Sequence, residues 1–441
     1  MTPLSTRLCR AIESAPMGRR LGRVVSFNGL VIEAEGPDAR LGELCLIEPR
    51  EASPPVQAEV VGFRKEHVLL MPYGHLGGIS TESLIHATGK PLNVPVGDGL
   101  LGRVVNAFSE PLDEGPAIVH ASHYPLYREP INPMQRAPID TALETGVRII
   151  DTLLTLGVGQ RVGVFAGSGV GKSTLLGMLA RQVSADVTVL ALVGERGREV
   201  GDFLVGALGP EGLKRSVVVV ATSDEPALVR AHAAHAAHAM AEYFRDQGKS
   251  VLLIVDSMTR FAMAQREVGL AVGEPPTFRG YTPSVFSQLP KLLERCGRLR
   301  TSGAITGVYS VLVEGDDMKE PITDHMRAIL DGHIVLDRDL AARGHHPAID
   351  PLYSASRLMD HVATEGEAEL AREAKRHLAT YAASRDLIEL GAHQRGVNTA
   401  LDQAVDLKPG LDRLMQQRPV EFTGRQEAYS QLSKVLGGQA S

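Results

Sequence analysis

The sequence predicts an α/β protein with a small N-terminal β-barrel, a central parallel sheet covered by helices, and a C-terminal helical domain. Three observations predict this fold. Short apolar runs separated by turn residues fill residues 19–92, strand and helix patterns alternate from Gly146 to about Arg343, and helical periodicity follows Asp360. A chain of 441 residues is long enough for several domains. The predicted parts are 1–18, 19–92, 93–360 and 361–441.

Composition excludes several classes of protein. The chain has 46 Lys plus Arg against 52 Asp plus Glu, a net charge of −6. This charge does not predict a cluster of cations that would bind nucleic-acid phosphates independently of base sequence. Only 4% of the residues are aromatic, which argues against base-stacking surfaces. No apolar run approaches the roughly 18 residues of a membrane span, and the first residues lack a signal peptide's apolar core.

The three cysteines predict a reducing compartment. Cys9, Cys45 and Cys296 are an odd number and lie far apart in the chain. Neither a disulfide framework nor a Cys-x-x-Cys metal site follows from this spacing, and the cytoplasm fits best.

Residues 1–18 predict a short basic amphipathic helix. Apolar residues share one face, with Arg7 and Arg10 beside them: Leu4, Leu8, Ala11, Ile12 and Ala15. Two interpretations stay open. The helix either packs on its own domain or docks to a partner or an acidic lipid surface.

The segment from Arg19 to Lys90 predicts a small closed barrel. Asn28-Gly29 between two apolar runs is a strong hairpin signal, and further short runs follow closely. Only Phe27, Phe63 and Tyr73 supply rings there, so a structural or assembly role is favoured over RNA binding. The stretch rich in Gly and Pro from Pro91 to Pro138 reads as a connector on a surface.

A phosphate-binding loop lies in the central part, in the order strand, glycine loop, helix. Glycines let backbone N–H groups surround phosphate oxygens, the lysine reaches the β and γ phosphates, and the serine supplies a hydroxyl to Mg²⁺. The strict pattern begins with Gly, whereas this chain has Ala at that position. Because alanine is also small, we expect the loop to form. Its residues are Ala166, Gly167, Ser168, Gly169, Val170, Gly171, Lys172, Ser173 and Thr174.

Two carboxylates follow predicted strands near this loop. Asp256 ends the apolar run Val251 to Val255, where an acid can hold the Mg²⁺ shell from the neighbouring strand; a helix N-cap is the alternative. Glu195 follows the apolar run Val187 to Val193 and can orient an attacking water. A charged solvated loop is the alternative for Glu195, but its position between the two phosphate motifs favours catalysis.

Two further groups have less specific patterns. Hydrolysis needs a cation at the transferred phosphoryl group, but Arg357 lies too far along the chain for spacing to assign it. His232, His235 and His238 recur every three residues and are joined by no carboxylate or Cys, so they predict a partly exposed helix face rather than a metal site.

Several stretches together resemble the flagellar and type III secretion export ATPases, relatives of the rotary ATP synthase catalytic subunits. The resemblance spans roughly residues 20 to 390 and is more specific than a phosphate loop alone. It lies in 165–174, 194–199, 239–246, 258–267, 273–286 and 330–336.

The resemblance implies a RecA-like P-loop ATPase core and a homohexameric ring that binds ATP and Mg²⁺ at subunit interfaces. By matching position, Glu195 would activate water, Lys172 would bind phosphate, and Ser173 and Asp256 would lie at Mg²⁺. Arg196 and Glu199 would support that site, with Glu199 on the metal side. Arg357 would be an arginine finger donated in trans to the neighbouring subunit's nucleotide. The adenine-pocket segments near His346-Pro347 and Gln416-Gln417 lack the aromatic residues of ATP synthase and stay unassigned.

The resemblance also implies partners and a location. The N-terminal segment would dock a stator-like regulatory partner and acidic membrane lipids. A central stalk protein, export substrates and their chaperones would be the other partners, with no specific nucleic acid. The protein would be cytoplasmic and lie peripherally at the inner-membrane export apparatus.

Flagellar export is favoured over a virulence-type injectisome by residues 216–224 and 280–286. A rotary ATP synthase subunit and a ring-shaped nucleic-acid translocase remain as alternatives. No Asn is followed by Lys, so the guanine-reading motif of a regulatory GTPase is missing.

Overall fold

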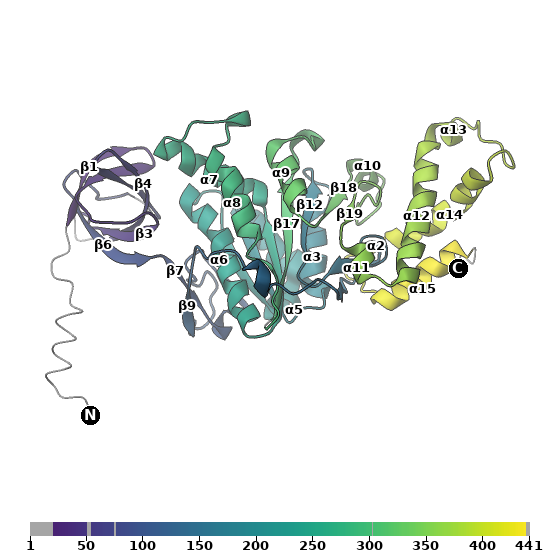
Figure 1. Cartoon of the computed structure of the whole chain (residues 1–441), viewed down its shortest axis with the longest axis horizontal. Coiled ribbons are helices and arrows are strands. Elements are labelled where there is room, and N and C mark those ends of the chain that lie inside the picture. Colours follow the sequence, from purple (N-terminus) through teal and green to yellow (C-terminus); the bar gives the residue numbers. More distant parts are fainter. Residues whose placement is uncertain (1–20, 51–53, 75, 302, 438–441) are drawn as a thin grey trace, which may run out of the picture. The chain divides into compact units, whose positions relative to one another are not determined.

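The computed structural model describes residues 21–50, 54–74, 76–301 and 303–437. The chain divides into two compact units (Figure 1). One comprises the residues up to Asn93 together with Glu267–Pro275, and the other comprises Val94–Arg266 and the residues from Pro276 onward. The predicted helix of residues 1–18 lies outside the described residues.

The first unit contains a closed barrel of strands in the order β1-β2-β5-β4-β3-β6. The predicted hairpin is present: Asn28 pairs with Val31, and Gly29 takes the left-handed φ of 63° that this turn needs. The sequence did not single out β6, which closes the barrel. Alternate strand residues such as Ile32, Ile47 and Leu70 are fully buried and form the core. The strands are β1 (Gly22–Asn28), β2 (Val31–Glu35), β3 (Glu43–Ile47), β4 (Val56–Arg64), β5 (His67–Pro72) and β6 (Leu84–Pro91).

The second unit is built on a nine-stranded sheet in the order β19-β18-β12-β17-β15-β13-β14-β8, with β16 paired to β17. The strands from β18 to β8 are parallel, whereas β19 and β16 are antiparallel. Their continuous apolar runs fit strands that are buried on both faces. They are β8 (Arg103–Val105), β12 (Arg161–Ala166), β13 (Val187–Val193), β14 (Ser216–Ala221), β15 (Ser250–Asp256), β16 (Gly297–Arg298), β17 (Ala304–Leu312), β18 (Gly332–Leu336) and β19 (Ala355–Ser356).

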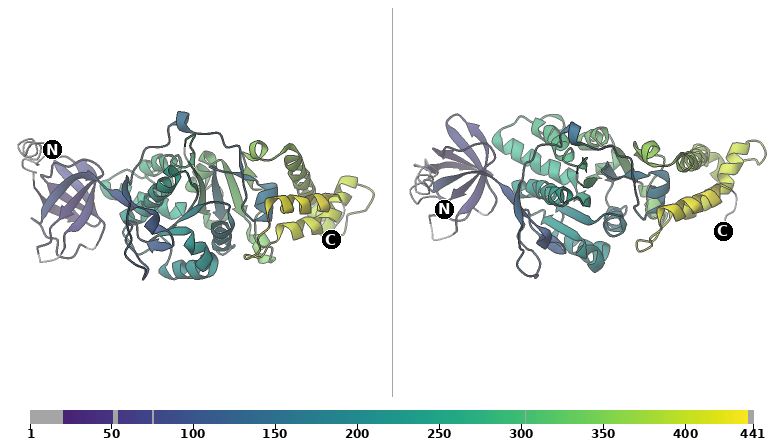
Figure 2. Two further views of the ribbon diagram at one scale, coloured as in Figure 1. Left: turned by 90° about the horizontal axis from the view of Figure 1, so that it is seen from below. Right: turned by 60° about the horizontal axis from the view of Figure 1, so that its bottom comes forward.

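Helices cover both faces of this sheet (Figure 2). Segment Phe203–Leu208 is a single π-helical stretch, η3, between α4 and α5. The helices are α2 (Arg148–Leu153), α3 (Lys172–Gln182), α4 (Gly197–Asp202), α5 (Gly209–Lys214), α6 (Ala227–Asp246), α7 (Met258–Val272), α8 (Pro283–Leu293), α9 (Pro321–Ile329), α10 (Arg338–Ala342) and α11 (Met359–Val362). Single 3-10 turns are η1 (Asp98–Leu100), η2 (Pro133–Gln135), η4 (Phe278–Gly280) and η5 (Glu314–Asp316).

The segment between barrel and sheet contains more regular structure than the sequence predicts. Arg103-Val104-Val105 forms β8 at the sheet edge, where three residues pair with β14. A run of three residues is too short for an alternation pattern to identify. The remaining short strands form two ribbons, β7 (Asn93–Val96) with β9 (Ser122–Pro125) and β10 (Ala142–Leu143) with β11 (Leu156–Gly157).

Four helices end the chain, as the periodicity predicts. The side chain of Thr364 accepts from the backbone N–H of Glu367 in a capping box that begins the longest of them. Leu378, Leu411 and Leu432 belong to the same hydrophobic cluster as Val164 of β12, so these helices share a core with the sheet. They are α12 (Glu365–Ala383), α13 (Arg385–Glu389), α14 (Thr399–Met415) and α15 (Arg425–Leu436). The domain boundary at 360/361 remains a prediction.

None of the helices in the part of the chain that the structure describes is both long and apolar enough to cross a membrane.

Candidate functional site

The phosphate-binding loop connects the end of β12 to the start of α3. Gly169 and Gly171 have φ values of 79° and 95°, which favour glycine, and Val170 is buried beneath the turn. Ala166 is the last residue of β12 and is itself buried, so the loop forms without a glycine there. The first residues of α3, Lys172 to Thr174, line a cavity together with the loop, and the N-terminus of a helix there can bind an anion.

Three predicted residues meet at the carboxyl ends of the parallel strands. The Nζ of Lys172 lies 2.6 Å from Asp256 Oδ1 and 3.5 Å from Glu195 Oε1. All three side chains are largely buried. Glu195 follows β13 and Asp256 ends β15, which are neighbouring strands, so both carboxylates point toward the start of α3.

One detail of the prediction is wrong: β15 does not neighbour β12. Strand β17 lies between them, because the sheet order is β12-β17-β15. Because β17 lies next to β15, Ser310 of β17 can donate a hydrogen bond from its Oγ to Asp256 Oδ1. Ser310 is fully buried and was not predicted as part of the site, since a single serine in an apolar strand has no distinguishing pattern.

The acidic groups perturb one another. Burial raises the pKa of Glu195 to about 7; the cation of Lys172 opposes this rise, and the nearby Asp256 and Glu199 carboxylates add to it. The pKa of Lys172 is also raised, because although burial lowers it, the charges of Asp256 and Glu195 outweigh that effect. The ammonium therefore stays charged at neutral pH, while Glu195 is close to its titration midpoint.

Arg196 and Glu199 lie at the mouth of the site. Their side chains are 79% and 50% exposed and form an ion pair of 3.5 Å across the first turn of α4. Glu199 lines a cavity of about 620 Å³ that also includes Ser173, Glu195 and Asp256 and extends to Pro419 and Val420. Both predicted supporting residues are therefore next to the reacting region rather than buried inside it.

Arg260 is a further residue of the site to which the sequence assigned no role. It comes from the first turn of α7 and lines a second cavity, of about 450 Å³, with Lys172, Glu195 and Arg196. Its Nε is buried and has no hydrogen-bond partner among the described residues, so a donor is available beside the phosphate loop. The stretch 258–267, already singled out in the sequence, contains this residue, but no spacing distinguishes it there.

Arg357 is not brought to the phosphate loop of its own chain. Its backbone N–H donates to Asp331 O at the amino end of β18, whereas the loop lies at the carboxyl ends of the strands. Its exposed side chain donates to Arg327 O at 3.0 Å. Within one chain, therefore, Arg357 cannot act on a nucleotide bound at the loop.

The two segments that the sequence left unassigned do meet. The backbone N–H of Gln417 donates to His346 O at 2.8 Å, and His346 Nδ1 would lie 3.8 Å from a Cβ on Gly171 of the phosphate loop. Arg148 of α2 holds this region through hydrogen bonds to Leu414 O, Gln416 O, Glu421 and Thr423. The segment around Gln416 and Gln417 thus lies near the phosphate loop, although it is far from the loop in the sequence.

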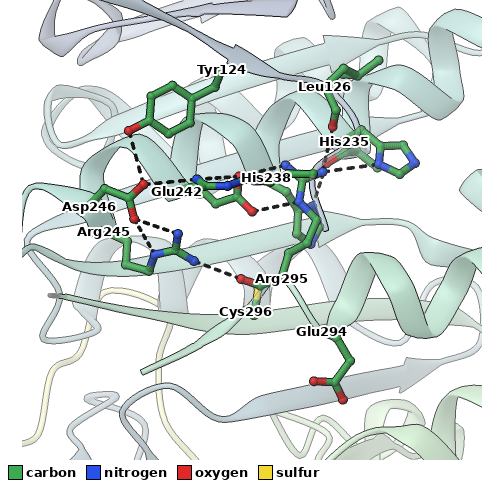
Figure 3. A network of polar contacts seen from close by, with 12 residues as sticks. Tyr124, Leu126, His235, His238, Glu242, Arg245, Asp246, Glu294, Arg295 and Cys296 are labelled. Atoms are coloured by element: carbon green, nitrogen blue, oxygen red, sulfur yellow. Dashed lines mark hydrogen bonds and ion pairs between the residues drawn. The ribbon is translucent and has the colours of Figure 1, made fainter. Parts of the chain in front are cut away.

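The histidine-rich helix α6 corrects another expectation. His232, His235 and His238 are buried, not partly exposed. His235 and His238 lie beside a polar network in which Arg295 forms two hydrogen bonds to Glu242, of 2.9 and 3.0 Å (Figure 3). His232 instead lies 2.8 Å from the hydroxyl of Tyr127. The alanines between the histidines are buried as well, so α6 is covered on all sides, which the spacing of the histidines does not reveal. Among the described residues, no three or more His, Cys, Asp or Glu side chains come together in a group that could hold a metal ion by themselves.

Comparisons with known proteins agree along the chain. Residues 146–356 match the ATP synthase alpha/beta family, nucleotide-binding domain, residues 24–89 match its beta-barrel domain, and residues 363–434 match the T3SS EscN ATPase C-terminal domain. A flagellum-specific ATP synthase of Bacillus subtilis is 51% identical over 98% of this chain and 99% of its own length. One from Treponema pallidum is 52% identical over 96% and 95%, and a type 3 secretion system ATPase of Xanthomonas euvesicatoria is 45% identical over 98% of each.

Solved structures give the same result. The assembled ATPase EscN from the type III secretion system of enteropathogenic E. coli has a TM-score of 0.87 and 44% identity, and the match covers 94% of this chain and 100% of that one. EscN in complex with its central stalk EscO matches equally well.

Proposed function

Since this chain belongs to the flagellar and type III secretion export ATPases of the ATP synthase alpha/beta family, we propose a specific role for each residue of its catalytic site. Membership in this family makes the chain an ATP-hydrolysing enzyme, and the resemblance stated from the motifs is confirmed. Identities of 51% and 52% to two flagellum-specific proteins, against 45% to the Xanthomonas secretion ATPase, support flagellar export as its function.

The observation that carries the proposal is the cluster of Lys172, Glu195 and Asp256 at the mouth of the phosphate loop. One buried cation between two carboxylates fits a site that receives a triphosphate and a metal ion. Lys172 and the loop N–H groups bind the phosphates of ATP. The hydroxyl of Ser173 and the carboxylates of Asp256 and Glu199, which line one cavity, would hold Mg²⁺, and the ion would supply positive charge against the phosphates.

Glu195 performs the step that distinguishes hydrolysis from binding. Its carboxylate accepts a hydrogen bond from a water and orients it for in-line attack on the γ phosphate. As the new P–O bond forms, the bond from the γ phosphorus to the β–γ bridging oxygen breaks, ADP leaves, and a proton of the water passes to Glu195. Lys172 and Arg260 supply positive charge to the γ phosphate from the same chain. Arg196 lies at the entrance of the site and pairs with Glu199 there. Ser310 keeps Asp256 in place through its hydrogen bond.

The assembly is a homohexamer with Arg357 acting in trans. Support comes from the position of Arg357 at the amino end of the sheet, away from its own loop, and from the similar protein that was solved in assembled form. A central stalk protein is a partner by likeness to the complex of EscN with EscO. A stator-like regulatory protein, export substrates and their chaperones complete the proposed partners, with the protein at the periphery of the inner membrane.

Replacing Glu195 by Gln tests the catalytic proposal. The amide keeps the size of the side chain but cannot carry the charge that orients the water, so turnover should fall at least about a hundredfold while MgATP binding is kept. ATP hydrolysis by the full chain and nucleotide affinity are the two measurements. Glu211→Gln, an exposed residue paired with Lys214, is the control. Full activity of Glu195→Gln would refute the assignment.

Deleting residues 1–18 tests the proposed docking segment. Binding to vesicles containing acidic lipid should weaken, because the segment carries Arg7 and Arg10, whereas binding to neutral vesicles should not change. Unchanged binding to the acidic vesicles would contradict the proposal.

A further inference from the structure

The chain segments that leave β17 and β18 meet across the phosphate loop. Strand β12 lies between these two strands, and Ala166 at its end is in register with Leu312 of β17 and Leu336 of β18 (Figure 1). Beyond β17 the chain forms η5, which ends at Asp316, and beyond β18 it forms α10, which begins at Arg338. The Nε of Arg338 donates to Asp316 Oδ2 at 2.9 Å, so an ion pair joins the segments on either side of the loop.

This pair, here named the Asp316–Arg338 clasp, touches the backbone of the phosphate loop. The Nη1 of Arg338 donates to Ser168 O at 3.4 Å. A Cβ placed on Gly167 would lie 2.4 Å from Asp316 Oδ1 and 2.8 Å from Arg338 Nη2. Both distances are far shorter than a carbon allows, so any other residue at 167 would displace the clasp.

The contact with Ser168 O has a consequence for phosphate binding. In a planar trans peptide the C=O and the following N–H point in opposite directions. When Arg338 holds the carbonyl of Ser168 on one side, the N–H of Gly169 is directed to the other side. Backbone N–H groups of this loop are the donors that surround phosphate oxygens, so the direction of each one matters for nucleotide affinity.

We propose that Asp316 and Arg338 are positioning residues that hold the phosphate-binding loop in the conformation that receives the nucleotide phosphates. The proposal rests on the proposed function, because it concerns the same loop. Asp316 orients the guanidinium of Arg338, and Arg338 fixes the peptide between Ser168 and Gly169. Neither side chain needs to touch the nucleotide.

The segment after β17 that contains Asp316 also offers a matched control. Asp317, the next residue, forms an ion pair of 2.9 Å with Arg279 of η4. The side chains of this second pair are 47% and 41% exposed, similar to the 55% and 52% of Arg338 and Asp316. The Asp317–Arg279 pair therefore matches the clasp in charge, length and exposure, and no contact recorded among the described residues links it to the phosphate loop.

The test compares Arg338→Gln, Asp316→Asn, the double variant and Arg279→Gln in the full chain. We measure the Kd for MgADP, the KM and kcat for MgATP, and the thermal unfolding temperature. Each clasp variant should raise Kd and KM about three- to tenfold, with a smaller change in kcat, and the double variant should be no worse than the worse single one. Arg279→Gln should bind MgADP like the wild type.

Other outcomes overturn the inference. Wild-type affinity in both single clasp variants would do so. Loss of affinity in Arg338→Gln with none in Asp316→Asn would mean that Arg338 contacts phosphate by itself, and an equal loss in Arg279→Gln would mean a general effect of surface charge. Failure of the wild type to bind or hydrolyse MgATP would instead contradict the proposed function.

A second comparison keeps the test decisive if one variant folds poorly. Gly167→Ala should lower MgADP affinity about three- to tenfold in the wild-type chain, as the clasp variants do, because the methyl group displaces the clasp. In the Asp316→Ala, Arg338→Ala background the same substitution should add little further loss, because the clashing atoms are gone. An equal added loss in both backgrounds would overturn the inference.

Discussion

At the scale of single residues, the unusual feature of this site is a carboxyl group poised to titrate near neutrality. Glu195 is mostly buried and shares its surroundings with Asp256 and Glu199, while the ammonium of Lys172 offsets part of their effect on its pKa. A carboxylate that orients water must be ionised. The pKa of about 7 therefore places the change between the protonated and the ionised carboxyl of Glu195 inside the physiological range.

We expect the kcat/KM for MgATP to rise about tenfold between pH 6 and pH 8. This quantity reports the free enzyme, in which a group with a pKa of about 7 is mostly protonated at pH 6 and mostly ionised at pH 8. The measurement is the initial rate at low MgATP concentration across this range at constant ionic strength. A rate that stays flat from pH 6 to 8 would show that Glu195 is already ionised in the free enzyme.

At the scale of elements, α6 shows how a helix can bury polar side chains without a metal ion. His238 donates from Nδ1 to Ala234 O at 2.7 Å, which leaves Nε2 to accept from the hydroxyl of Tyr309 at 3.1 Å. Burial, with a further contribution from the charge of Arg295, lowers the pKa of His238 to about 3. The folded chain therefore favours the neutral form of this histidine.

Acidification should consequently destabilise the wild type more than His238→Gln. Because the pKa of this histidine is lower in the folded chain than in the unfolded chain, its contribution to stability is complete above about pH 6.5 and is lost as the pH falls toward the folded value. From pH 7.5 to pH 5 the free energy of unfolding should fall about 2 kcal/mol further in the wild type than in the variant.

Urea denaturation at the two pH values measures this difference. His123→Gln, at an exposed position in β9, should follow the wild type. Equal losses in the wild type and in His238→Gln would contradict a buried neutral His238.

At the scale of the whole molecule, one chain holds a phosphate site and a candidate finger at opposite ends of its sheet. Lys172 and Glu195 lie at the carboxyl ends of the strands, and Arg357 lies beside the amino end of β18. A rigid sheet keeps these two ends apart. A complete site containing Arg357 therefore needs a second copy of the chain.

Mixing two inactive variants tests this arrangement. Arg357→Ala should lower kcat about a thousandfold or more, since it removes the cation that stabilises the transition state, and Lys172→Ala should lose nucleotide binding. In a random equal mixture roughly a quarter of the interfaces combine an intact loop with an intact Arg357, so activity should reappear. ATP hydrolysis is measured together with the mass of the assembly. If the mixture assembles but stays inactive, Arg357 does not act in trans.

Some parts of this protein follow from local sequence. The phosphate loop, Glu195 and Asp256 each occur beside a strand that is recognisable from a few consecutive residues, and the barrel hairpin follows from Asn28-Gly29. Strand, turn and helix propensity act over short stretches of chain. The sequence by itself therefore determined the fold class and predicted the residues that meet at the centre of the candidate site.

Only the tertiary structure decided which distant residues complete that site. Ser310 and Asp316 reach it because β17 lies between β12 and β15, and Arg338 reaches it because β18 lies on the other side of β12. No local sequence pattern predicts this strand order. The burial of the α6 histidines likewise depends on what packs around the helix. Contacts between segments far apart in the chain are set by how the layers pack, and side-chain periodicity carries information only about the face that a residue occupies.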